Sequence, residues 1–78
     1  MGKYKNQKYI KEVANQIKEQ SEEKKKEIVK ELKEYYEEAL YDYNKINPYT
    51  APEEKERRTQ AVYYYEDLFR ELEEKGGK

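Results

Sequence analysis

Apolar residues recur every three or four positions in three separate stretches of the chain. The longest stripe lies in the middle and consists of Ile28, Val29, Leu32, Tyr35, Tyr36, Ala39, Leu40, Tyr43 and Ile46. Residues with this spacing share one face of an α-helix. The pattern predicts a helix over about 22–47, with Ser21 as its N-cap and Glu22 and Glu23 in its first turn, where acids suit the helix dipole.

A second stripe predicts the last helix, over about 51–75. Its apolar face consists of Ala61, Val62, Tyr65, Leu68, Phe69 and Leu72. Thr50 and Glu53 have the spacing of a capping box at the start, and Gly76 suits a C-terminal cap. We expect Leu68 and Phe69, together with Leu32 of the middle helix, to be buried.

The remaining segments are shorter. A first helix over about 4–19 is predicted by the apolar positions Ile10, Val13, Ala14 and Ile17. Pro48 and Pro52 mark a turn at 47–51, because a proline disfavours a helical residue before it and fits the first turn of a helix. Residues 76–78 form a tail. The lysines before Tyr9 lie at the positive end of the first helix, so we expect fraying to reach about that residue.

The connection between the first two helices allows two architectures. Residues 18–27 contain no apolar residue, glycine or proline, so one long helix from about Lys3 to Asn47 is conceivable. The apolar residues of its first part would then find partners only if two chains associated. We favour an all-α antiparallel three-helix bundle, with residues 1–78 as a single domain and the chain a monomer. The alternative is a long-helix hairpin that forms a homodimer.

Composition narrows the function. Charged residues make up 45% of the chain, which has no cysteine and no histidine, so disulfides, thiolate chemistry, imidazole bases and common zinc sites are excluded. The net charge of −1 does not suit a nucleic-acid binder, and no apolar run is long enough to span a membrane. We expect a cytoplasmic, non-catalytic protein with no cofactor, no metal site and no nucleic-acid or membrane partner.

Charge is distributed unevenly along the chain. Residues 1–18 carry five lysines and one glutamate, whereas residues 19–47 and 48–78 have net charges of −3 and −2. This asymmetry favours packing of the first segment against the two acidic ones. The alternative is a basic arm that projects toward an acidic surface.

The ten tyrosines supply the candidate contact residues. In the segment AVYYYEDLF, Tyr65 falls on the apolar face, Tyr63 lies opposite and Tyr64 on the flank, so the last two should be largely exposed. Exposed helical positions usually hold Glu or Lys, and tyrosine is enriched at binding surfaces. The predicted protein-binding residues are Tyr41, Tyr63, Tyr64, Gln60 and Asp67. The alternative is that the tyrosines pack at the boundary of a thin bundle.

The segments SEEKKKEIVKELKEYYEEAL and TAPEEKERR resemble computationally designed (de novo) helical-bundle miniproteins. The likeness lies in surfaces rich in Glu and Lys, acids after a Ser or Thr cap and a terminal GGK. It implies a stable scaffold made to bind a chosen protein, and it carries no functional motif. Two alternatives are a self-assembling helical structural protein and a small phage or bacterial regulatory binding protein.

Overall fold

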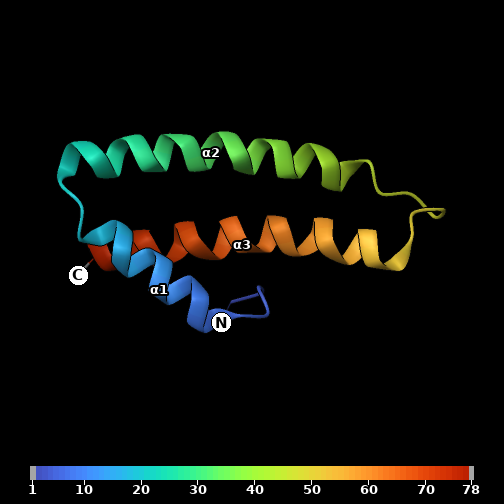
Figure 1. The fold of residues 1–78 in the computed structure, drawn as a ribbon, viewed down its shortest axis with the longest axis horizontal. Coiled ribbons are helices and arrows are strands. Elements are labelled where there is room, and N and C mark those ends of the chain that lie inside the picture. The colour runs from blue at the N-terminus through green and yellow to red at the C-terminus, as the bar shows by residue number, and fades with distance from the viewer. Residues whose placement is uncertain (1, 78) are drawn as a thin grey trace.

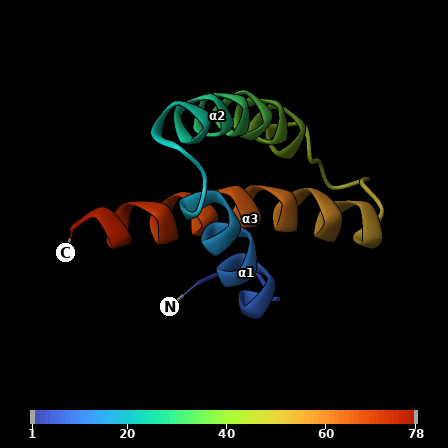
Figure 2. The ribbon, with the colours of Figure 1, turned by 60° about the vertical axis from the view of Figure 1, so that its left-hand side comes forward.

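The computed structural model describes residues 2–77, and side chains as far as residue 73. Three helices follow one another, α1 (Gln7–Lys18), α2 (Glu22–Asn44) and α3 (Pro52–Gly77). Helices α2 and α3 lie side by side and antiparallel, and α1 packs obliquely on α3 (Figures 1 and 2). The predicted all-α three-helix bundle is confirmed.

Ser21 separates α1 from α2. Its backbone is extended (φ −65°, ψ 164°), and its hydroxyl accepts a hydrogen bond from the Lys24 N–H at 3.3 Å. The chain therefore ends one helix and begins another within three residues, although residues 18–27 favour helix throughout. The alternative of one long helix is wrong.

The ends of the other elements differ by a few residues from the predictions. Helix α1 begins at Gln7, where Asn6 caps it by accepting from the Tyr9 N–H at 3.1 Å. Helix α2 ends at Asn44, three residues early. Helix α3 continues through Gly76 to Gly77, and no described glycine has positive φ, so the predicted C-cap at Gly76 is wrong.

The predicted capping box at the start of α3 is also wrong. The Thr50 hydroxyl accepts from the backbone N–H of Asn47 at 3.0 Å, and the Asn47 side chain accepts from the Tyr49 N–H at 2.8 Å. These bonds close the turn on itself, so Thr50 does not cap the helix. The first bond of α3 instead runs from the Lys55 N–H to the Ala51 carbonyl at 2.9 Å.

The core lies where α1 meets α3. Its buried cluster consists of Ile10, Ala14, Ile17 and Leu68. The prediction that Leu68 is buried is confirmed, but Leu32 and Phe69 are only partly buried. The reason is length: α1 has 12 residues, whereas α2 has 23 and α3 has 26, so α1 covers only part of the α2–α3 hairpin. No residue of α2 is buried.

Candidate functional site

Asp67 holds the N-terminal segment against α3. Its side chain is 4% exposed, and its Oδ2 accepts hydrogen bonds from the backbone N–H groups of Lys3 (2.7 Å) and Tyr4 (2.6 Å) and from Gln7 Nε2 (2.9 Å). A buried carboxylate needs such donors, because removing its charge from water is otherwise costly. Asp67 is therefore an internal anchor for residues 3–7.

The surroundings of Asp67 keep it ionised. Burial raises the pKa of its carboxyl group, but the hydrogen bonds from Tyr4, Gln7 and Lys3, with the positive charge of Arg70, outweigh burial and lower the pKa below its ordinary value. Its second oxygen, Oδ1, is buried without a hydrogen-bond partner. The anchor thus depends on one oxygen and on the charged form of the group.

Tyr64 packs at the centre of an aromatic cluster next to this anchor. Its ring lies edge-on to Tyr4 and Tyr65, with centroids 5.3 and 5.0 Å away, and stacks on Tyr9 at 5.9 Å. Burial, with the neighbouring phenols of Tyr9, Tyr65 and Tyr4, raises the pKa of Tyr64 to about 12. The prediction that Tyr64 is largely exposed is wrong.

The N-terminal segment also contacts α3 through its charges. The backbone N–H of Lys5 donates to Gln60 Oε1 at 3.1 Å, and Lys5 Nζ lies 3.8 Å from Glu56. Lys3 Nζ lies 3.8 Å from Glu66 and 5.5 Å from the ring centroid of Tyr63. The basic first segment therefore packs on an acidic helix, as its charge predicted, although such exposed pairs stabilise only weakly.

The five predicted contact residues fall into two groups. Residues 3–9 occupy the side of α3 that holds Gln60, Tyr64 and Asp67, so these three do not form an exposed face. Tyr63 is half-buried, so the prediction that it is largely exposed is also wrong. Tyr41 is 61% exposed, with Lys45 Nζ 4.4 Å from its ring centroid. Binding by Tyr41 and Tyr63 stays a prediction.

A groove between α2 and α3 is the largest feature that sequence reasoning missed. Two open hollows of about 490 and 650 Å³ share Val29, Lys33 and Leu72 and so form one groove along the hairpin. We call it the α2–α3 groove, and its apolar floor consists of Ile17, Val29, Tyr36, Leu40, Phe69 and Leu72. Only the end of α1, at residues 17–18, reaches it.

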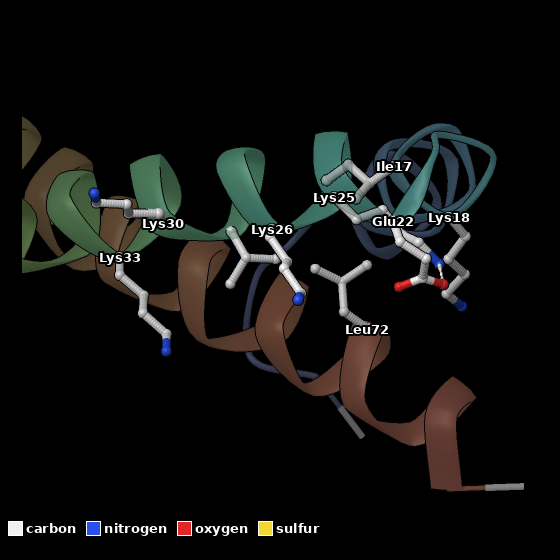
Figure 3. Close-up of a pocket in the computed structure, with 9 residues that line it drawn as sticks. Ile17, Lys18, Glu22, Lys25, Lys26, Lys30, Lys33 and Leu72 are labelled. Carbon is white, nitrogen blue, oxygen red and sulfur yellow. Dashed lines mark ion pairs between the residues drawn. The ribbon is translucent and has the colours of Figure 1, made fainter.

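The two ends of the groove differ in charge. The end near α1 is bordered by Lys18, Lys25, Lys26, Lys30 and Lys33, with Glu22 as its acidic residue (Figure 3). Glu22 pairs with Lys25 at 3.4 Å, and Leu72 points from α3 into the space between the helices. The far end is bordered by Glu37 and Glu73. A signal for this arrangement exists in the spacing 26, 29, 33, 36, 40, which places two lysines and three apolar residues on one helical face.

The residues around the groove offer apolar side chains, lysine ammonium groups and carboxylates. Across the described residues, no three side chains of the metal-binding types come together, and none of the helices combines the length and apolarity needed to cross a membrane. A hydrogen bond of 2.9 Å from the Tyr36 hydroxyl to Glu66 joins α2 to α3 beside the floor. Burial and that carboxylate raise the pKa of Tyr36, so the phenol stays protonated as a donor.

Comparisons with protein-family models, with curated proteins and with solved structures find no match to this chain. A function for the chain therefore has to be argued from its own residues. The Asp67 anchor and the tyrosine cluster find their contacts within the chain, in residues 3–9. The α2–α3 groove, by contrast, leaves apolar side chains open to solvent.

Proposed function

We propose that this chain is a non-catalytic helical protein that binds another protein through the α2–α3 groove. The observation that supports it is the state of α2, which carries a long apolar stripe and yet has no buried residue among its 23. Apolar area gains about 25 cal/mol per Å² when it leaves water. A partner that covers the floor of the groove would therefore gain free energy that the isolated chain does not.

The shape and lining of the groove favour a helical partner. It follows the hairpin for several turns, and its floor is aliphatic and aromatic, like other grooves that receive the apolar face of a helix. Long lysine side chains at its border cover apolar surface with their stems and keep their charges in water. This keeps an open groove soluble until a partner displaces them.

The proposal includes a designed origin, on the strength of the sequence style alone. The structure adds that Ser21 acts as the N-cap of α2, with Glu22 and Glu23 in its first turn, which is the capping arrangement that designers choose. The exposed Tyr41 lies with Glu38 and Asp42 beside the acidic end of the hairpin.

The test is a selection of helical peptides from a random displayed library against the intact chain. Peptides that bind should lose at least tenfold in affinity against Leu40→Glu, because a charge then lies on the groove floor. The matched control is Tyr49→Glu, which introduces the same charge at a turn residue that is 94% exposed. Circular dichroism confirms that both variants fold. Binders that tolerate Leu40→Glu as well as the control would contradict the proposal.

A further inference from the structure

The two ends of the α2–α3 groove carry opposite charge, and this order specifies the chemistry of an occupant. The inference rests on the proposed function, because it names the partner of the same surface. We infer that the groove binds an amphipathic helix of another protein. The apolar face of that helix is flanked by carboxylates over the end near α1 and by a basic residue over the far end.

The end of the groove near α1 is strongly basic. Five lysines and one glutamate line it, a local net charge of +4 in a chain whose net charge is −1 (Figure 3). Lys25 pairs with Glu22 at 3.4 Å. The other four lysines form no ion pair with any residue that the structure describes. Carboxylates of a partner would therefore meet ammonium groups that the chain itself leaves without a counter-charge.

The lysines at this end have the spacing of a helix face. Lys26, Lys30 and Lys33 follow one another along α2 at intervals of four and three residues. Side chains at these intervals are neighbours on a helix surface, about 5–6 Å apart. A second helix laid along the groove repeats the same intervals. Glutamates at its own i, i+4 and i+7 positions can thus face all three lysines.

The apolar floor continues beyond the lysines. Val29 and Leu72 line both hollows of the groove, and Leu40 lines the second. Between Glu22 and Leu40, α2 rises about 27 Å, the length of about 18 helical residues. A helix of that length would lie between α2 and α3 as an added member of the bundle. Helix α1 does not obstruct it, because only residues 17–18 reach the groove.

The far end of the groove distinguishes a helix from a simple anionic amphiphile. Glu37 and Glu73 line that end, and Lys33 is the basic residue there. A fatty acid has a single carboxylate for the lysines and brings no positive charge to the two glutamates. A helix can carry both signs in the required order, and it can cover both parts of the floor.

A second copy of the chain does not offer the required face. The carboxylates of Glu34, Glu38 and Asp42 line a separate hollow with Tyr41, whereas the apolar floor of the groove is bordered by lysines at the end near α1. An occupant needs carboxylates directly beside its apolar residues. The partner is therefore a different protein.

Fluorescence anisotropy with labelled synthetic peptides tests the inference on the intact chain. Two peptides share leucines at i, i+3, i+4 and i+7 over about five turns. In the mixed peptide, glutamates flank the leucines in one half and lysines in the other; in the basic peptide, all flanking residues are lysines. The mixed peptide should bind at least about tenfold more tightly, and the difference should shrink in about 0.5 M salt, which screens charges.

Variants of the groove border provide the matched comparison. Lys26→Glu/Lys33→Glu should weaken the mixed peptide at least about tenfold and strengthen the basic one. The milder Lys26→Gln/Lys33→Gln should weaken the mixed peptide about threefold, and it replaces the first variant if circular dichroism shows that the first does not fold. The control Lys8→Glu/Lys55→Glu makes the same change in net charge at exposed positions outside the groove and should bind like the wild type.

Three results would overturn the inference. One is equal affinity for the mixed and basic peptides, and another is a loss in the Lys8→Glu/Lys55→Glu control as large as that at the groove. The third is a different occupant. Binding of dodecanoate, but of neither peptide, that Lys26→Glu/Lys33→Glu abolishes would identify an amphiphile. A dimer in sedimentation equilibrium that Leu40→Glu dissociates would identify a second copy.

The displayed library separates this inference from the proposed function. If the library yields binders that Leu40→Glu abolishes, but these show no preference for acids beside their apolar face, the charge order is rejected and the proposed function stands. If neither the library nor the mixed peptide gives binding that Leu40→Glu weakens, both are rejected.

Discussion

The two sides of α3 are covered by the rest of the chain to different extents. On one side, residues 3–18 cover the helix, and Asp67, Gln60 and Tyr64 meet them with hydrogen bonds and ring contacts. On the other side, α2 and α3 leave a groove whose floor is open to solvent. The difference shows that apolar patterning alone does not close a surface in so small a domain. The side of α3 that residues 3–18 cover, called the closed side from here on, also supplies hydrogen-bond partners for polar groups.

The contrast follows from the length of α1. With 12 residues, it reaches only about half the length of the α2–α3 hairpin. Residues 3–6 extend the cover without forming helix, and the backbone N–H groups of Lys3 and Tyr4 require an acceptor, which Asp67 provides. Within the residues that the structure describes, no other segment covers the opposite side. The groove is thus the surface that a three-helix fold with one short helix leaves unpaired.

The largest effect should come from the core of the closed side. Leu68 has 0% exposure, so Leu68→Ala should lower the free energy of unfolding by about 2–4 kcal/mol through lost transfer energy and a cavity. Leu40→Ala, on the open floor, should cost less than about 1.5 kcal/mol in the monomer. Urea unfolding followed by circular dichroism measures both. Equal losses would mean that the groove is as well packed as the core.

The second-largest loss of stability should come from Asp67, which anchors the N-terminal segment. Asp67→Ala removes the acceptor for two backbone N–H groups and one side-chain amide, and we expect a loss of about 1.5–3 kcal/mol. In the wild type, slow exchange of the Lys3 and Tyr4 amide protons should accompany the anchor, in place of the fraying expected from the sequence. In the variant these amides should exchange quickly while those of Tyr36 and Leu40 change little. Rapid exchange at Lys3 and Tyr4 already in the wild type would show that the anchor is weak.

Low pH should weaken the contacts of the N-terminal segment with Asp67 more than the rest of the fold. The folded-state pKa of Asp67 is lowered, so its contribution to stability is complete above the unfolded pKa of about 3.9 and is lost as pH falls through the folded pKa. The Lys3 and Tyr4 amide signals should shift in this range when followed by NMR. The control is Asp67→Asn, which has no carboxyl group to titrate and should lack the transition. A transition of the same size in that variant would assign it to other carboxylates.

High pH should destabilise the same side of α3, because the Tyr64 phenol then ionises. Its folded pKa is raised to about 12, so the fold favours the neutral phenol, and this contribution is complete below the unfolded pKa of about 10 and is lost as pH rises toward 12. An absorbance titration of the phenols should show a late step, and Tyr64→Phe should reduce its amplitude, since the pKa values of Tyr36 and Tyr65 are also raised. Tyr41→Phe, on the exposed face of α2, should leave that step in place. The same reduction of the late step in both variants would contradict the assignment.

The smallest effect on stability is expected at Tyr41. Its side chain is 61% exposed and contacts Lys45 across its ring, so Tyr41→Ala should change the free energy of unfolding by less than about 0.5 kcal/mol. Thermal unfolding provides the measurement. A larger loss would show that Tyr41 supports the helix, and it would then be unsuitable as a contact residue.

Local signals predicted the elements well because their causes are local. The apolar stripes, the Ser21 cap and the proline-containing turn each act within a few residues, and they place the three helices. Asp67 could not be recognised in this way, since its partners lie 63 and 64 residues away. The one local hint was an aspartate inside a helix, where it is a poor helix former without a special partner.

The tyrosine surface was mispredicted for a related reason. A helical wheel sorts Tyr63, Tyr64 and Tyr65 by direction, but it does not show that residues 3–9 cover the flank of α3. The groove escaped prediction because it depends on the difference in length between α1 and the hairpin. Both are properties of how whole elements meet, which no single segment encodes.

The distance in sequence between Asp67 and its partners also bears on the order in which contacts form. Helices α2 and α3 are joined by the short turn at 45–51, so their pairing closes a small loop. The bonds from Lys3 and Tyr4 to Asp67 close nearly the whole chain, at a greater entropic cost and with a slower search. We therefore expect the hairpin to form first and the N-terminal segment to dock last. During synthesis on a ribosome, Lys3 and Tyr4 are made long before Asp67. Their backbone N–H groups can therefore bond to Asp67 only after α3 has been synthesised.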